Sequence, residues 1–250
     1  MLDAQAKKYG FQVTHIAVPH PGNEQQAQWL QVRQIRPDWV ILRGWGVMNP
    51  TALKAAAKSG FPRDKIVGVW WSGAEEDVIP AGDAAKGYIA AGFNLPGTSF
   101  PVMQEVLKHV YKKGKGEMDD KSRIGSIYHT RGIVAGIITA EAIRTAQSQF
   151  GKGKPMTGEQ VRWGIEHLNI DEKRLKDLGA VGLMQPLKVS CTDHEGGGAV
   201  KFLQWDGKKW NVITDWISSD QSLVRPMIEA SAAQYAKEKS ITARDCGKEN

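Results

Sequence analysis

The chain has 250 residues, of which 41% are hydrophobic and 24% charged, with a net charge of +6. This composition excludes a disordered or fibrous protein, and the length allows one large domain or two small ones around a real core. No apolar run approaches the ~18 residues of a membrane span, and residues 1–8 have no apolar signal-peptide core. The basic residues are scattered, so we expect no nucleic-acid partner.

The first 93 residues alternate between predicted helices and strands. The predicted helices end at a glycine or just before a proline, which do not continue a helix. Asn23 and Asn49 are the expected helix caps, the first in a capping box with Gln26. Strands that alternate with helices in this way indicate an α/β fold with a doubly wound parallel sheet. The expected elements are helices over 2–9, 23–36 and 50–59, and strands over 12–18, 39–42, 66–71 and 87–93.

Two aromatic loops follow neighbouring strands of this predicted sheet. Gly44 and Trp45 follow one strand, and Trp70, Trp71 and Ser72 end the next. The carboxyl ends of parallel strands form the ligand crevice of an α/β sheet, and rings placed there can stack on a planar ligand. The alternative for each tryptophan is packing against a helix. We predict that these five residues line a ligand site.

Another candidate site lies at the start of a long apolar helix, predicted over 133–146 after a strand over 124–128. Tyr128 and Arg131 lie where this helix begins. Free backbone N–H groups and a guanidinium can together hold an anion there. A surface ion pair is the alternative for Arg131.

The rest of the chain predicts further helices and strands. Ser99 is the expected cap of a helix that continues to position 110, and Thr157 with Gln160 forms a capping box. Asp206-Gly207 between two apolar runs is a hairpin signal. The expected elements are helices over 157–168 and 222–239 and strands over 187–190, 199–205 and 210–217.

Cys191 and Cys246 are the two cysteines of the chain, too few for a disulfide framework or a zinc cage. They either form one disulfide that ties the C-terminal segment to the body or remain separate thiols. Cys191, Asp193 and His194 are residue types that bind metals or transfer protons. Adjacent residues in an extended segment point in opposite directions, however, so a turn rich in charge and glycine is the main expectation. We expect no metal and no cofactor.

The order of these features resembles the second lobe of type I periplasmic binding proteins of the Leu/Ile/Val-binding-like branch. These are solute receptors of ABC importers. The resemblance rests on a helix end at 35–38, the glycine-aromatic loop, a second helix end at 58–61, the segment 82–87 and the hairpin at 206–207. Their order and spacing, rather than any one motif, carry the resemblance.

The resemblance implies three segments. Residues 1–93 correspond to the second lobe, residues 94–200 to a crossover and the remainder of an incomplete first lobe, and residues 201–250 to a late hairpin and a C-terminal helix that returns to the second lobe. Family members begin with a signal peptide and the start of the first lobe, so we expect a fragment or a start codon placed within the gene. Uncovered apolar helices would then favour a homo-oligomer.

The resemblance also implies a periplasmic receptor without catalysis, whose partner is a membrane permease. In the amino-acid binders of this family, the loop that corresponds to residues 70–73 supplies a carboxylate for the ligand ammonium. Tryptophan stands there in this sequence, and an aromatic face does not replace that charge.

We therefore predict a small aromatic carboxylate, such as a benzoate or cinnamate derivative, as the ligand. Arg131, Ser72 and helix N-termini would hold the anion, and the tryptophans would stack on the ring. Two alternatives remain open. One is a ligand-sensing module of a signalling receptor, and the other is an α/β hydrolase or amidase that uses Asp193, His194 or Cys191.

Overall fold

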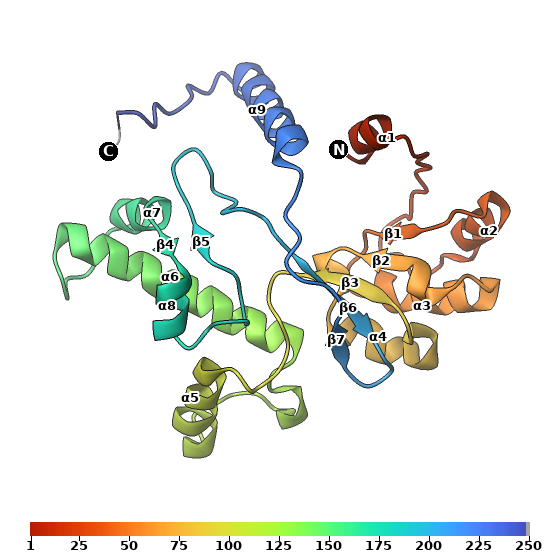
Figure 1. Cartoon of the computed structure of the whole chain (residues 1–250), viewed down its shortest axis with the longest axis horizontal. Helices are drawn as coiled ribbons and strands as arrows, with labels where there is room; N and C mark the ends of the chain where they lie inside the picture. Colours follow the sequence, from red (N-terminus) through yellow and green to blue (C-terminus); the bar gives the residue numbers. More distant parts are fainter. Residues whose placement is uncertain (249–250) are drawn as a thin grey trace.

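A computed structural model describes residues 1–248. Its main feature is a five-stranded sheet with the order β1-β2-β3-β6-β7 (Figure 1). The first three strands are parallel, which confirms that part of the predicted sheet. The last two are antiparallel and form the predicted hairpin. The strands are β1 (Val40–Leu42), β2 (Ile66–Gly68), β3 (Ile89–Gly92), β6 (Lys201–Trp205) and β7 (Trp210–Val212).

The first hydrophobic core lies between this sheet and the helices beside it. Trp29, Leu53 and Ile66 from the N-terminal half pack there with Leu203 and Trp210 of the hairpin. Burial of such side chains is the main stabilising contribution, at roughly 1.5–3 kcal/mol for each large one. The helices are α1 (Leu2–Tyr9), α2 (Gln26–Ile35), α3 (Met48–Ser59) and α4 (Glu75–Val78).

A second core forms around the long helix α6, at the opposite end of the molecule from α2 and α3 (Figure 1). Val134 of α6 packs there with Leu168, Ile170, Leu175 and Val189. A small antiparallel sheet of β4 (Asn169–Ile170) and β5 (Leu187–Lys188) covers it. The helices of this region are α5 (Pro101–His109), α6 (Ile127–Phe150), α7 (Gly158–Glu166) and α8 (Glu172–Asp177). The proposed boundaries at 93 and 200 remain a prediction.

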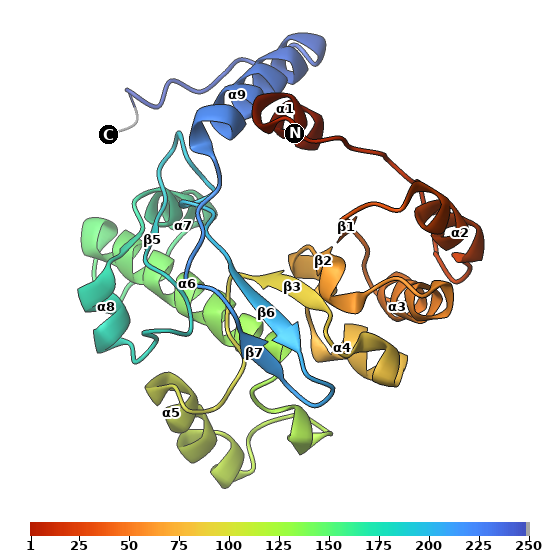
Figure 2. The same cartoon turned by 45° about the vertical axis from the view of Figure 1, so that its right-hand side comes forward.

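The C-terminal helix α9 (Gln221–Glu238) lies beside α1, as Figure 2 shows. The Lys8 ammonium contacts the Asp220 carboxylate at 2.5 Å, and the Tyr9 hydroxyl donates to the same carboxylate at 2.6 Å. On its other side, Arg225 of α9 donates to the Thr192 carbonyl. The last two positions of the predicted segment 201–250 lie outside the described residues.

Two predicted strands are wrong. Residues 12–18 form no strand, and β1 is the edge of the sheet. A strand requires a partner for its backbone hydrogen bonds, and residues 12–18 have none in the sheet. Residues 124–128 instead lead into α6, which begins at Ile127 because the Ser126 hydroxyl caps the helix by accepting the His129 N–H.

Three predicted caps are also wrong, although the helices form. Gln25, Val47 and Phe100 hold the cap positions of α2, α3 and α5, and Asn49 is buried inside α3. The predicted capping box of Thr157 and Gln160 is confirmed at α7. Within residues 1–248, no helix combines the length and the apolar character that crossing a membrane requires.

Candidate ligand-binding site

Four of the predicted site residues line one small pocket of about 210 Å³: Trp45, Trp71, Tyr128 and Arg131. Trp45 follows β1, Trp71 follows β2, and the other two lie in the first turns of α6. Because β1 and β2 are parallel, their carboxyl ends and the two tryptophan loops that follow lie at the same end of the sheet. The start of α6 supplies the other two lining residues, so the pocket joins the two predicted groups.

The rings form a continuous aromatic surface. Neighbouring ring centroids lie 6.0 Å apart for Trp45 and Trp71, 5.4 Å for Trp71 and Trp70, and 5.3 Å for Trp70 and Phe93. Trp45 is 53% exposed and Trp70 is 38% exposed, so neither serves the core alone. Phe93 was not predicted, although it follows the parallel strand β3 and the same edge rule would have found it.

Arg131 is enclosed by rings. Its guanidinium carbon lies 4.8 Å from the ring centroid of Trp70, 5.2 Å from that of Phe93 and 5.1 Å from that of Tyr128. These distances are typical of cation–π contacts. Burial lowers the pKa of Arg131, and nearby Tyr128 and acidic groups oppose that shift. An arginine stays charged at neutral pH, so the pocket has a fixed cation in its wall.

Each backbone carbonyl of the turn that carries Trp70 and Trp71 accepts a hydrogen bond from a side chain elsewhere in the chain. This short 3₁₀ turn, Trp70–Ser72, is too short to satisfy them internally. Arg131 donates to the first carbonyl at 3.2 Å, Asn49 to the second at 3.4 Å, and the Tyr88 hydroxyl to the third at 2.9 Å. The donors come from α6, α3 and the residue before β3. The turn therefore has one defined position relative to three separate elements.

A hydrogen bond between Ser72 and Gly44 connects the loop that carries Trp45 with the turn that carries Trp70 and Trp71. The Ser72 side chain is fully buried and its hydroxyl donates to the Gly44 carbonyl at 2.7 Å. Its hydroxyl is thus used within the protein rather than directed at the pocket, where we expected it to help hold an anion. A Cβ atom at Gly44 would lie 2.6 Å from Asn49 Oδ1 and 3.2 Å from Met48 Cβ. The backbone approach at this position leaves no room for a side chain.

A buried carboxylate completes the layer beneath the pocket. Asp77 accepts from Asn49 Nδ2 at 2.7 Å and from the Ala74 N–H at 2.8 Å. Burial raises the pKa of Asp77 from 3.8 to about 6, although both hydrogen bonds favour the ionised form. Sequence analysis missed Asp77, because an acidic residue in the first turn of a helix is usually a solvated one.

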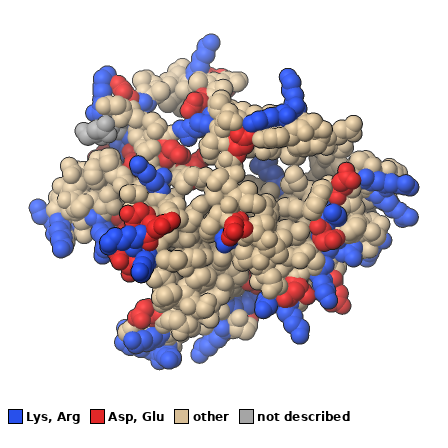
Figure 3. All heavy atoms as spheres, in the orientation of Figure 1, with Lys and Arg blue, Asp and Glu red and all other residues tan. Residues whose placement is uncertain are grey.

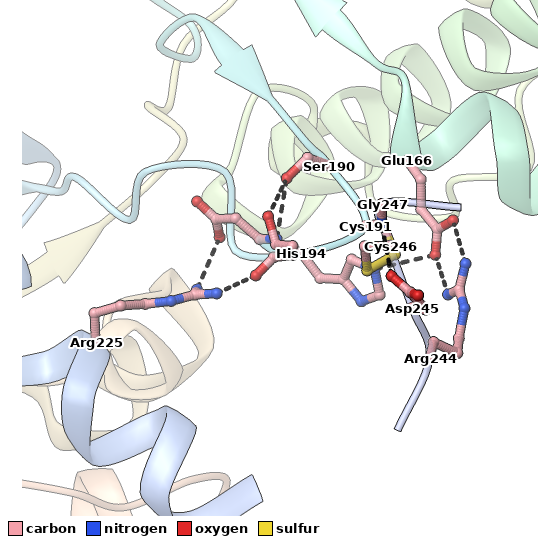
Figure 4. The surroundings of a disulfide bond; sticks show 11 residues. Glu166, Ser190, Cys191, His194, Arg225, Arg244, Asp245, Cys246 and Gly247 are labelled. Carbon is pink, nitrogen blue, oxygen red and sulfur yellow. Dashed lines mark hydrogen bonds and ion pairs between the residues drawn. A yellow bond between two sulfur atoms is a disulfide. The ribbon is translucent and has the colours of Figure 1, made fainter. Parts of the chain in front are cut away.

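A second and larger cavity, of about 360 Å³, lies beside a disulfide. Cys191 and Cys246 are joined with their Cα atoms 5.7 Å apart, so of the two alternatives the disulfide is formed (Figure 4). Glu166 lies at this cavity, where it accepts from Arg244 at 2.7 Å and 3.0 Å. The Arg244 hydrogen bonds lower the pKa of Glu166 to about 2.

The residues of the alternative catalytic cluster point to different partners. Cys191 is held in the disulfide and His194 contacts Glu166 at 3.2 Å (Figure 4). Asp193 faces Arg225 at 3.6 Å. A nucleophile and a base need to be within hydrogen-bond reach of each other, and these groups are engaged elsewhere. In the part of the chain that the structure describes, no three His, Cys, Asp or Glu side chains gather as a metal site would require.

The charged side chains do not form one field on the face seen in Figure 3. Lysines and arginines alternate there with aspartates and glutamates, and an extended uncharged area lies between them. On this face the two signs of charge are mixed, so it carries no large patch of a single sign.

Comparisons with known proteins agree with this architecture. A family model described as periplasmic binding protein matches residues 2–209. A solved chain from the Pseudomonas fluorescens group, described as an ABC transporter permease, is 51% identical with a TM-score of 0.93 and covers 98% of this chain. The match spans 59% of that chain. Comparison with curated proteins gives no match.

Two more distant solved structures share the fold. A branched-chain amino acid ABC transporter from Thermus thermophilus with bound valine is 23% identical, with a TM-score of 0.69, 88% coverage of this chain and 57% of its own. A solute-binding protein of an ABC transporter from R. palustris, in complex with benzoate, is 15% identical, with a TM-score of 0.59, 86% coverage and 55% of its own. The chain thus spans between one half and two thirds of the length of each neighbour.

Proposed function

Because the chain belongs to the periplasmic binding protein family, we propose that it serves as part of the solute-binding receptor of an ABC importer. Its ligand is a small aromatic carboxylate. The receptor acts outside the cytoplasm, binds without catalysis and delivers the ligand to a membrane permease. The chain spans 59% of the length of its 51% identical relative, so the activity, ligand and permease of a whole receptor are stated here as proposals.

One observation carries the choice of ligand: the pocket combines a ring-enclosed guanidinium with two further tryptophan faces. A guanidinium forms strong charge-assisted hydrogen bonds with a carboxylate. Offset or edge contacts with Trp45 and Trp71 suit a flat ring, at roughly 0.5–1.5 kcal/mol for each aromatic pair. A ligand that is both flat and anionic would use both features.

An α-amino acid is the competing ligand. Its ammonium group would need a carboxylate or several acceptors in the pocket wall. The lining residues are Trp45, Trp71, Tyr128 and Arg131, and Asp77 lies buried beneath them. The neighbours with bound valine and bound benzoate share the fold, so the fold admits either class and the lining residues favour the aromatic acid.

The test is a calorimetric titration with benzoate, cinnamate, leucine and valine. We expect saturable binding of an aromatic acid, weakened by Trp71→Ala and by Arg131→Gln. The matched controls are Trp39→Ala, which removes a half-exposed tryptophan stacked on Lys65, and Arg33→Gln on the exposed face of α2. Tighter binding of leucine or valine than of any aromatic acid would overturn the choice of ligand.

A further inference from the structure

We propose that Asn49 and Asp77 are positioning residues of the aromatic pocket. They do not line it. They fix the place of the turn Trp70–Ser72, and so the place of its two rings, relative to α3. The inference rests on the proposed function only where it calls these rings ligand-binding.

Hydrogen bonds of Asn49 and Asp77 connect three segments, namely α3, the turn Trp70–Ser72 and α4. Asn49 lies in α3, directly after the loop that carries Trp45, and its Nδ2 contacts the Trp71 carbonyl at 3.4 Å and Asp77 Oδ1 at 2.7 Å. Asp77 lies in α4 and its second oxygen accepts from the Ala74 backbone at 2.8 Å. Both side chains are buried. One amide therefore ties the tryptophan turn to the helices on either side of it.

The orientation of the Asn49 amide depends on Asp77. Its Nδ2 has two acceptors, whereas its Oδ1 is buried without a hydrogen-bond partner among the described residues. This oxygen faces Gly44, where a Cβ would lie 2.6 Å from it. The reverse orientation would direct Oδ1 at the Asp77 carboxylate and the Trp71 carbonyl, and three acceptors would then face one another. The ionised carboxylate therefore selects the orientation in which Asn49 supports Trp71.

Several charged and titratable groups surround Asp77. Glu76 on the same helix raises its pKa, and Arg131 of α6 lowers it. Burial raises the pKa of Tyr88 before β3 and of Tyr128 in the pocket wall, and the Asp77 carboxylate adds to both shifts. Asp77 is thus within electrostatic reach of both the support and the lining of the pocket.

Protonation of Asp77 would allow the hydrogen bond between Asn49 and the Trp71 carbonyl to break. A neutral carboxyl offers an O–H donor, which the unpaired Asn49 Oδ1 can accept once the amide turns. The Trp71 carbonyl would then lose its donor. Because burial raises the pKa of Asp77 to about 6, this step falls within an accessible pH range.

The experiment is ¹⁹F NMR of the protein labelled with 5-fluorotryptophan, with the Trp71 resonance assigned by Trp71→Phe. His20 lies 6.4 Å from Trp45, so the titration is repeated in a His20→Gln variant to control for any effect of that ring on the tryptophan resonances. We expect the Trp71 resonance to shift with a midpoint near pH 6, and Asp77→Asn to abolish this titration. Glu76→Gln is the matched control, since Glu76 is exposed and pairs with Arg123. It should still titrate, with a midpoint slightly below that of the parent, because Glu76 raises the pKa of Asp77.

A Trp71 resonance that does not titrate while Asn49 and Asp77 are both unchanged would overturn the proposal. Titration of Asp77→Asn like the parent would do the same. Benzoate titration adds the link to binding: Asn49→Ala should weaken it by roughly three- to tenfold, the range for loss of one buried hydrogen bond. If no aromatic acid binds the parent protein, the proposed ligand fails, while the ligand-free resonance still decides the positioning role.

Discussion

The aromatic pocket and the cavity beside the disulfide are held together in different ways. In the pocket, side-chain donors from three elements fix each carbonyl of one short turn. At the larger cavity, residues 55 positions apart are linked by one disulfide, and one ion pair joins Arg244 to Glu166. Hydrogen bonds from several separate elements set the position of a group closely, whereas a covalent link mainly limits how far a segment can move. The first arrangement suits recognition, and the second suits attachment of the C-terminal segment.

Removal of the disulfide should have the largest effect on stability and leave the pocket intact. The double change Cys191→Ser and Cys246→Ser opens a loop with a sequence separation of 55 residues. Chain entropy for a loop of this size predicts a loss of about 4 kcal/mol in the free energy of unfolding. Urea denaturation measures it. A simultaneous loss of benzoate binding would show that the two regions are not independent.

The free energy of unfolding should depend on pH through the titration of Asp77. Its pKa is raised from 3.8 to about 6, so the native state binds the proton more tightly than the unfolded chain. Stability from this group is fully present at low pH and is lost as pH rises through about 6, by about 3 kcal/mol over the whole range. Denaturation at a series of pH values, in the parent and in Asp77→Asn, isolates this contribution. Identical slopes would contradict it.

Titration of Glu166 should change the free energy of unfolding with pH in the opposite direction. Because Arg244 lowers its pKa to about 2, its contribution is present at neutral pH and is lost as pH falls below 4.5 toward 2. Arg244→Gln should reduce stability at neutral pH by about 1.5 kcal/mol, the low end for a hydrogen bond to a charged group, since the arginine is partly exposed. The same change at low pH should have little effect. Equal losses at both pH values would point to packing rather than charge.

The smallest expected effect is that of Ser72→Ala. It removes the hydroxyl that donates to the Gly44 carbonyl and leaves that acceptor unpaired, at about 1 kcal/mol. Thermal unfolding measures the loss, and Ser59→Ala is a control that removes a similar hydroxyl-to-carbonyl bond at the end of α3. A weaker affinity for benzoate in Ser72→Ala alone would show that the joined loops matter for binding.

Local signals in the sequence predicted the elements whose causes are local. The capping box at Thr157 and the glycine at position 10 act within one turn, and both helix ends form as expected. The buried strand before Trp70 was also clear, because its apolar run is bounded by a helix end. Residues 12–18 have similar apolar character, but a strand exists only with a partner, and sequence carries no information on which edge is free.

The sequence predicted only part of the candidate site, because some of its residues are brought together by tertiary packing. The order of parallel strands follows from a rule of topology, which brought Trp45 and Trp71 to one edge. Asp77 and Tyr88 depend on which side chains the folded chain buries beneath that edge. An aspartate in an acidic run and a tyrosine before a strand carry no signal of their own, so their roles became visible only in the structure.

The enclosure of Arg131 by three rings has a consequence for the thermodynamics of binding. A free arginine side chain on a surface samples many rotamers, and fixing it on a ligand costs about 2 kcal/mol of conformational entropy. Here contacts with Trp70, Phe93 and Tyr128 restrict those rotamers before any ligand arrives. The side chain has already lost this entropy in folding, so the carboxylate ligand that we propose would find its partner preorganised.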